Sequence, residues 1–190
     1  MLKILYVHGY LGHANGNASK LIKAELNRRN IECELDAPPI PILHPKLAVE
    51  YIRAIDRDYD VIVASSMGAF YAMQEFGRLK ILVNPALTKT FMKTGDRFDD
   101  AVLKEMQKME DDFFNIFKDY ESIIETYLVF GTRDTLADNK NFFINHYSES
   151  QIYDVDMEHR MDKNGARKVV DIIENEILPI SRSDDGHLTV

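Results

Sequence analysis

The chain has 190 residues, 45% of them hydrophobic and 28% charged, which is ordinary for one folded domain with a sizeable core. Its formal net charge of −8 argues against nucleic acid or an anionic membrane surface as the main partner, because both require clustered Lys and Arg. Cys33 is the only cysteine, which excludes an internal disulfide and a thiolate metal cluster. With no disulfide possible, we expect a cytoplasmic protein. No apolar run is long enough to span a bilayer.

Six short segments have the pattern of β-strands. Four are apolar throughout and should be buried on both faces of a sheet: 4–7, 61–64, 81–83 and 127–130. Two mixed segments, 31–35 and 151–155, are typical of edge strands. Helical patterns lie between the strands, which predicts a mostly parallel six-stranded sheet covered by helices, a three-layer α/β/α sandwich.

Four helices are predicted from apolar residues at three- and four-residue spacing. The first begins after Asn17, and the second begins near Pro45. The third runs from a turn at Ser66 to Gly77. The last has its apolar residues between Ala166 and Ile177 and stops before Pro179. We expect residues 1–180 to form a single domain. The polar tail, 181–190, should be frayed and flexible.

The segment 86–125 is longer than an ordinary connection between strands. Apolar residues at positions 102, 106, 109, 113 and 117 recur there at helical spacing, and the other faces are acidic. Two interpretations stay open. The segment is a helical lid insertion whose Met and Phe stripe lines an acyl pocket, or a helix that covers ordinary core.

The run 61–70, VIVASSMGAF, is the most informative stretch of the sequence. It has the pattern of a buried strand, a sharp turn with a serine, and a helix, which is typical of a nucleophile elbow. Such a turn needs small residues two positions before and after the serine. Ala64 and Gly68 flank Ser66 in this way, whereas a frame centred on Ser65 would place bulky residues at both flanks. Ser66 is therefore the candidate nucleophile.

A serine nucleophile needs a base and an orienting acid, which in this topology follow it as acid and then histidine. Asp134 follows the strand at 127–130 and a glycine turn, so it should lie at the carboxyl edge of the sheet. Asp138 competes for the acid role, but it precedes a helical pattern at 139–147 and is interpreted as its N-cap. His159 is the only histidine between the last strand and the last helix, so it is the candidate base.

Acyl transfer also needs donors for the developing oxyanion. One should be the backbone N–H of Met67, directly after the serine, and the other that of Tyr10, with Leu11 as the alternative. Gly9 lets the loop after the first strand turn inward, and Gly9 and Leu11 should contact substrate. His8 is interpreted as a residue that braces this loop.

Other chemistries have weak support in the sequence. The glycines after the first strand do not form a G-x-G-x-x-G motif, and the remaining histidines lack ligand spacing. We therefore expect neither a cofactor nor a metal.

With these motifs in hand, the chain resembles the α/β-hydrolase superfamily and, more narrowly, the small YqiA-like esterases. The matching pieces are Tyr6–Tyr10, Ser65–Gly68, Leu82–Ala86, Asp134 with Asp138, and His159, in family order over almost the whole chain. The resemblance implies a sheet ordered 2-1-3-4-5-6 and hydrolysis of acyl esters or thioesters. It also implies Ser66 as nucleophile, Asp134 as acid and His159 as base.

The leading hypothesis is thus a serine esterase or thioesterase that acts on a small acyl ester. A second hypothesis is a non-catalytic binding or interaction module of the same fold, and a third is a different α/β enzyme that uses the glycine loop for phosphate. The sequence leaves open the acyl chain, the leaving group, the lid state and the oligomeric state.

Overall fold

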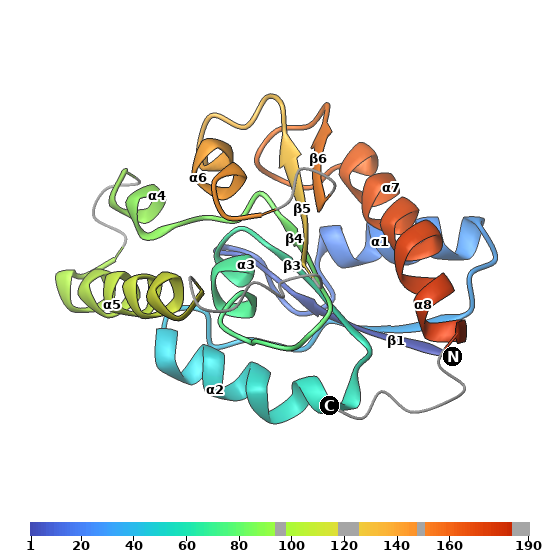
Figure 1. Ribbon diagram of the computed structural model, residues 1–190, viewed down its shortest axis with the longest axis horizontal. Coiled ribbons are helices and arrows are strands. Elements are labelled where there is room, and N and C mark those ends of the chain that lie inside the picture. Colours follow the sequence, from blue (N-terminus) through green and yellow to red (C-terminus); the bar gives the residue numbers. More distant parts are fainter. Residues whose placement is uncertain (94–97, 118–125, 148–150, 184–190) are drawn as a thin grey trace.

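Six strands form the centre of the molecule in the order β2-β1-β3-β4-β5-β6, in a computed structural model that describes residues 1–93, 98–117, 126–147 and 151–183 (Figure 1). The strands are β1 (Leu2–Val7), β2 (Cys33–Asp36), β3 (Val61–Ser65), β4 (Lys80–Val83), β5 (Thr126–Gly131) and β6 (Ile152–Val155). All five pairings are parallel. The predicted fold class and strand order are confirmed, and the sheet is parallel throughout.

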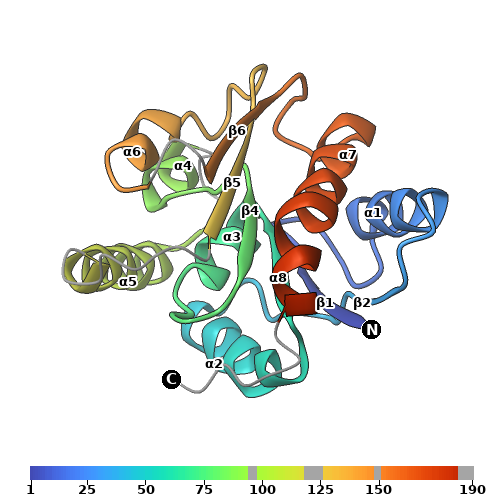
Figure 2. The same cartoon turned by 45° about the vertical axis from the view of Figure 1, so that its right-hand side comes forward.

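Helices cover both faces of this sheet (Figure 2). One face carries α1 (Asn17–Arg28), α7 (Lys163–Ile172), the π-helical turn η3 (Ile173–Ile177) and α8 (Leu178–Ser183). The other carries α2 (Pro45–Ile55), α3 (Met67–Ala72), α4 (Thr88–Lys93), α5 (Asp100–Phe117) and α6 (Lys140–Ile144). A short 3₁₀ turn, η1 (Asp56–Asp58), follows α2. Among the described helices, none is both long and apolar enough to cross a membrane.

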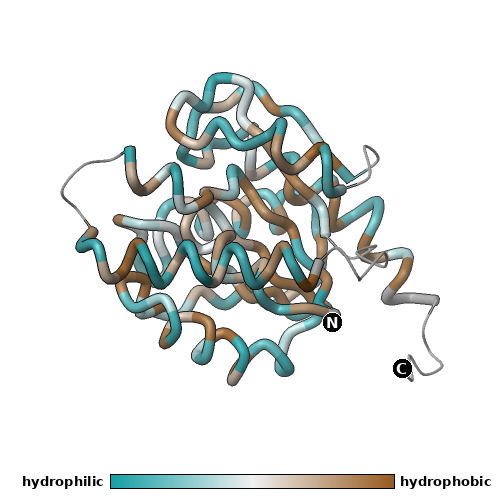
Figure 3. The backbone as a smooth tube through the Cα atoms, turned by 60° about the vertical axis from the view of Figure 1, so that its left-hand side comes forward, coloured by the Kyte–Doolittle hydropathy of each residue, from teal (hydrophilic) through white to brown (hydrophobic). Residues whose placement is uncertain are grey.

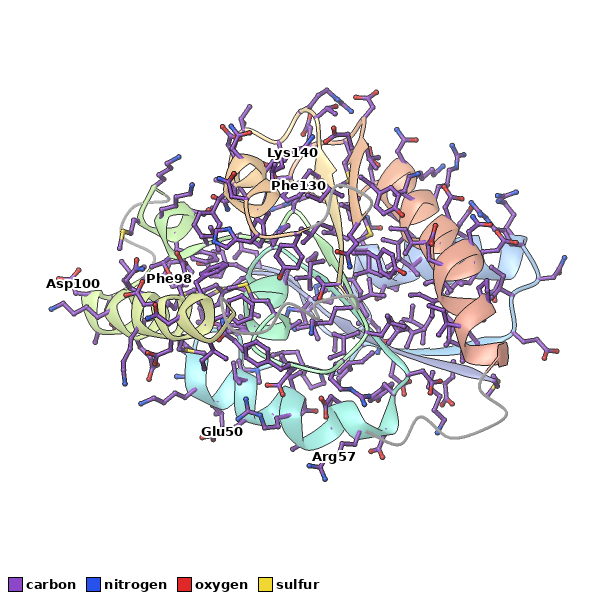
Figure 4. All side chains as sticks on the ribbon, in the orientation of Figure 1. Glu50, Arg57, Phe98, Asp100, Phe130 and Lys140 are labelled. Carbon is purple, nitrogen blue, oxygen red and sulfur yellow. The ribbon has the colours of Figure 1, made fainter. Side chains whose placement is uncertain are left out.

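The central strands are apolar throughout because both of their faces are covered. In β3, Ile62 and Ala64 belong to the core on the α3 side, whereas Val61 and Val63 belong to the core on the α1 side. Hydrophobic segments accordingly concentrate in the interior, and the outer turns of the helices are largely hydrophilic (Figure 3). Figure 4 shows Glu50 and Arg57 pointing away from the sheet at the outer face of α2 and η1, and both are exposed.

The segment 86–125 contains α4 and α5, with residues 94–97 and 118–125 outside the described part of the chain. Met106 and Phe113, from the apolar stripe of α5, are buried in the core that also contains α3. Lys46 of α2 forms an ion pair with Glu105 of α5 at 3.2 Å. This part of the stripe therefore packs on the core, as in the interpretation of a helix that covers ordinary core. The domain boundaries and the lid remain predictions.

Two predicted helix ends are wrong. Helix α3 ends at Ala72, not at Gly77, because the N–H groups of Gln74 and Glu75 donate to carbonyls three residues back. The Phe70 carbonyl accepts instead from the side-chain amide of Gln74, at 3.3 Å.

The last helix also does not stop before Pro179. The Leu178 N–H donates five residues back, to Ile173 O, in the π-helical turn. Pro179 then lies in the first turn of α8, where a residue without an N–H is tolerated. Helix α8 extends to Ser183, and the rest of the predicted tail lies outside the described residues.

Candidate active site

Ser66 occupies the sharp turn between β3 and α3, at the carboxyl edge of the sheet. Its backbone has φ 53° and ψ −119°, a strained combination for a residue with a side chain. Two hydrogen bonds to the end of β4 and the turn that follows it hold this residue: the Ser66 N–H donates to Val83 O at 2.9 Å, and the Ala86 N–H donates to Ser66 O at 3.3 Å. The turn thus presents the hydroxyl group of Ser66 in a fixed position.

The second flanking position of this turn has room only for glycine unless the neighbouring main chain shifts. A Cβ atom on Gly68 would lie 2.4 Å from His8 O and 2.5 Å from Val7 O, so even a methyl group collides with the end of β1. The methyl group of Ala64, at the first flank, is fully buried in the core. Close packing of α3 against β1 therefore sets the geometry around Ser66.

Three side chains from the loops after β3, β5 and β6 form one hydrogen-bonded chain. The distance from Ser66 Oγ to His159 Nε2 is 2.8 Å, and that from His159 Nδ1 to Asp134 Oδ2 is also 2.8 Å. Because an ionised carboxylate only accepts, Nδ1 carries the proton and Nε2 of the neutral ring accepts from the serine hydroxyl. The three residues chosen from the sequence thus meet in space.

The carboxylate of Asp134 is held from its other side as well. Its Oδ1 accepts from the N–H groups of Leu136 at 2.8 Å and Ala137 at 3.0 Å. Burial by itself raises the pKa of this carboxyl group. The hydrogen bonds from His159, Ala137 and Leu136 outweigh that effect, and the pKa of Asp134 lies below its usual value. Asp134 is therefore ionised at neutral pH.

Asp138 does not join this chain. It is exposed, and Asn139, one residue later, occupies the N-cap position of α6, so the N-cap prediction for Asp138 is wrong by one residue. The side chain of Asn139 is buried and donates to Pro85 O at 3.0 Å and to Thr90 Oγ1 at 3.1 Å. The amide of Asn139 thus bonds across the fold and not to the first turn of α6, where it makes no capping hydrogen bond.

The two backbone segments proposed to bind an oxyanion lie beside Ser66. Met67 is the first residue of α3, where N–H groups have no acceptor within the helix, and its side chain is fully buried. Gly9, Tyr10 and Leu11 line the same pocket as Ser66. Leu11 has φ 60° and is 62% exposed, so its side chain stands at the rim.

His8 lies beneath this loop and is buried. Its Nε2 accepts from the Ile40 N–H at 3.4 Å, and its Nδ1–H donates to Gly9 O at 3.1 Å. Both ring nitrogens are thus occupied by main-chain groups, and the histidine connects the loop after β1 to the segment after β2. This geometry fits the bracing role inferred from the sequence.

A pocket of about 400 Å³ opens at Ser66 and His159. Its apolar lining includes Phe91 and Phe98, and the centroid of the Phe98 ring lies 5.0 Å from that of the Tyr10 ring. This volume suits a small ligand.

The polar groups of the pocket include a pair of hydroxyls next to the serine. Tyr6 and Ser65 hydroxyls are 2.8 Å apart, and burial raises the pKa of Tyr6 to about 12, so the phenol keeps its proton. Arg160 is exposed and lines the pocket, and the described lining residues include no Asp or Glu. Over the described ranges, no group of three His, Cys, Asp or Glu side chains is placed to hold a metal ion.

Sequence reasoning did not assign a role to Asn84, which follows β4. Its buried side chain is hydrogen-bonded to the main chain at Gly131, before Asp134, and to the main chain of the loop 156–162 that carries His159, here called the histidine loop. The available signal was the dipeptide Asn84-Pro85 directly after a buried strand, a pattern that marks a turn.

Comparisons with solved structures define the class of fold. The chain is similar to the mouse alpha/beta hydrolase domain-containing protein 10, with a TM-score of 0.63, 13% identity, and coverage of 94% of this chain and 90% of the other. It is similar to S-formylglutathione hydrolase from Staphylococcus aureus, with a TM-score of 0.62, 14% identity, and coverage of 92% and 82%. A thioesterase domain from the curacin biosynthetic pathway gives a TM-score of 0.62, 11% identity, and coverage of 91% of each chain.

These likenesses, together with the parallel sheet and its strand order, show that the chain has the α/β-hydrolase fold. No family model and no curated protein matches the sequence. The narrower likeness to YqiA-like esterases therefore stays a prediction.

Proposed function

We propose that the protein is a serine hydrolase that cleaves a small acyl ester or thioester. The observation that carries the proposal is the unbroken hydrogen-bonded chain from Ser66 through His159 to Asp134, with both distances at 2.8 Å. Ser66 lies in a strained turn and lines the pocket, where a substrate carbonyl would meet its hydroxyl group.

In the first half of the proposed reaction, Ser66 Oγ attacks the carbonyl carbon while its proton passes to His159 Nε2. The negative charge that develops on the carbonyl oxygen is stabilised by the N–H groups of Met67 and Tyr10, or Leu11 in place of Tyr10. Asp134 holds Nδ1–H and stabilises the imidazolium. The tetrahedral intermediate then collapses, and the alcohol or thiol leaves with the proton from Nε2.

The second half restores the enzyme. A water molecule attacks the acyl carbon of the acylated serine and gives its proton to His159 Nε2. The bond between the acyl carbon and Ser66 Oγ breaks, the serine recovers a proton from the imidazolium, and the carboxylic acid leaves.

The names of the structural neighbours support a hydrolytic function in general terms. They include a thioesterase domain, S-formylglutathione hydrolase and an esterase domain from a Rhodothermus marinus protein. The pocket volume and its apolar wall suit a short acyl group, and a free small molecule is the expected partner.

The test is hydrolysis of p-nitrophenyl acetate and of a short acyl thioester by the whole chain. Ser66→Ala should lower kcat by about three orders of magnitude or more, and His159→Ala and Asp134→Asn should also lower it strongly. The matched control is Ser65→Ala, which removes a neighbouring hydroxyl outside the hydrogen-bonded chain. A folded wild type without turnover on any ester or thioester would favour the non-catalytic binding module. Equal loss in Ser65→Ala and Ser66→Ala would contradict the assignment of Ser66.

A further inference from the structure

The turn after β4 contacts every loop that carries a residue of the proposed catalytic chain. Val83 and Ala86 hold the main chain of Ser66 through the two hydrogen bonds described above. Asn84 lies between them and faces the loops after β5 and β6. This central position follows from the strand order, because β4 is the neighbour of both β3 and β5.

The Asn84 side chain makes three hydrogen bonds to main-chain groups. Its Nδ2 donates to Glu158 O at 3.0 Å and to His159 O at 2.9 Å. Its Oδ1 accepts from the Gly131 N–H at 2.7 Å. Both amide hydrogens are thus donated to the histidine loop, and the amide oxygen accepts from the start of the turn that leads to Asp134.

The two loops meet at the place that this amide bridges. A Cβ atom on Gly131 would lie 2.5 Å from Met157 O and 2.9 Å from Glu158 O, so their main chains are in close contact there. The Arg133 N–H also donates to Met157 O, at 3.1 Å. A small shift of the histidine loop would therefore change the distance between the imidazole and both of its partners.

A turn requirement alone does not explain this residue. Asn84 has φ 45°, in the left-handed region, which Gly adopts more easily than Asn. Glycine could therefore form the turn, but it could not donate to the histidine loop. The side chain of Asn84 is 1% exposed, and leaving the carbonyls of residues 158 and 159 unsatisfied would be costly.

We infer that Asn84 is a positioning residue, which fixes the main chain at His159 so that the imidazole reaches Ser66 and Asp134 at the same time. The inference rests on the proposed function only where it predicts a loss of turnover. Asn84 does not line the pocket that contains Ser66, among the residues described there, so it acts through His159 and not on substrate.

The experiment compares Asn84→Gly with Asn139→Gly in the whole chain. Asn84→Gly removes the amide and leaves the positive φ unstrained. Asn139 is the matched control, because it is also 1% exposed and its amide also donates two hydrogen bonds, but to Pro85 and Thr90 and not to the histidine loop. Three quantities are measured: the urea midpoint of unfolding, kcat and KM for p-nitrophenyl acetate, and the low-field proton NMR signal of the His159 Nδ1–H.

We expect both variants to lose stability and only Asn84→Gly to lose catalysis. Its kcat should fall about 100-fold with little change in KM, because a misplaced catalytic group costs about that factor. The low-field signal should be lost or broadened in Asn84→Gly and retained in Asn139→Gly. An unchanged signal and equal kcat in the two folded variants would overturn the inference.

Two further arms keep the test decisive. If Asn84→Gly does not fold, Asn84→Asp preserves the volume and the acceptor for Gly131 N–H but turns an oxygen toward two carbonyls. It should show the same losses, and wild-type kcat in Asn84→Asp would overturn the inference. If the wild type has no turnover, the proposed function fails, but loss of the NMR signal in Asn84→Gly alone still supports the positioning role.

Discussion

Replacement of Gly68 by alanine tests whether close packing behind the nucleophile sets the geometry of the site. The new methyl carbon would lie 2.4 Å from His8 O and 2.5 Å from Val7 O. An ordinary carbon–oxygen contact is about 3.3 Å, so α3 or the end of β1 must move by roughly 1 Å. We expect a stability loss of about 1–3 kcal/mol for the overpacked position and a fall in kcat of about 100-fold for the displaced serine or oxyanion loop.

The assay measures the free energy of unfolding in urea and kcat for p-nitrophenyl acetate. Gly77→Ala is the control, because Gly77 has φ 68° and no atom of the described residues lies within 4 Å of the added carbon. Its left-handed backbone should cost about 1–2 kcal/mol in an alanine variant and leave kcat unchanged. A folded Gly68→Ala variant with wild-type kcat would refute the reasoning.

Three other predictions concern charge and the pocket wall. The Asp134→Asn variant should have a lower free energy of unfolding than the wild type at neutral pH, and the difference should shrink as pH falls below about 4. Folding lowers the pKa of Asp134, so the ionised carboxylate stabilises the fold, and this contribution is lost as the folded carboxylate becomes protonated. Urea titrations across that range check this, and a pH-independent difference would contradict it. In Arg160→Glu, kcat/KM for an ester with a carboxylate on its acyl chain should fall roughly five- to tenfold relative to a neutral ester, because exposed charge interactions are worth up to about 1 kcal/mol each. The ratio should recover at high salt, and an unchanged ratio at low salt would contradict the role of Arg160. In Phe98→Ala, KM for a butyryl ester should rise roughly tenfold with little change for acetyl, because the ring forms the apolar wall; equal changes for the two esters would count against it.

Much of the fold could be predicted because its signals are local. The four central strands are apolar on both faces, and β3 shows why: alternate residues enter two different cores. The nucleophile turn could be recognised from Ala64 and Gly68, because contact with β1 leaves no room for a larger residue at the second flank. Asp134 and His159 follow strands whose carboxyl ends meet at one edge of the sheet.

The features that sequence reasoning missed depend on contacts between distant segments. Pro179 predicts a helix end, but the π-helical turn before it shifts the hydrogen bonding so that a new helix begins. The burial of Asn139 against Pro85 and Thr90 is set by tertiary packing, which no local pattern predicts. The three hydrogen-bond partners of the Asn84 side chain lie 47 to 75 positions away along the chain, so no local pattern predicts them.

The most direct test of the proposed chemistry is reaction of the whole chain with a fluorophosphonate, followed by peptide mass spectrometry. Such a probe forms a covalent adduct with a serine only when a base has activated its hydroxyl. We predict one adduct, on Ser66, absent in Ser66→Ala and formed far more slowly in His159→Ala. No adduct on the folded wild type, or labelling of Ser66 at an equal rate without the imidazole, would contradict the account.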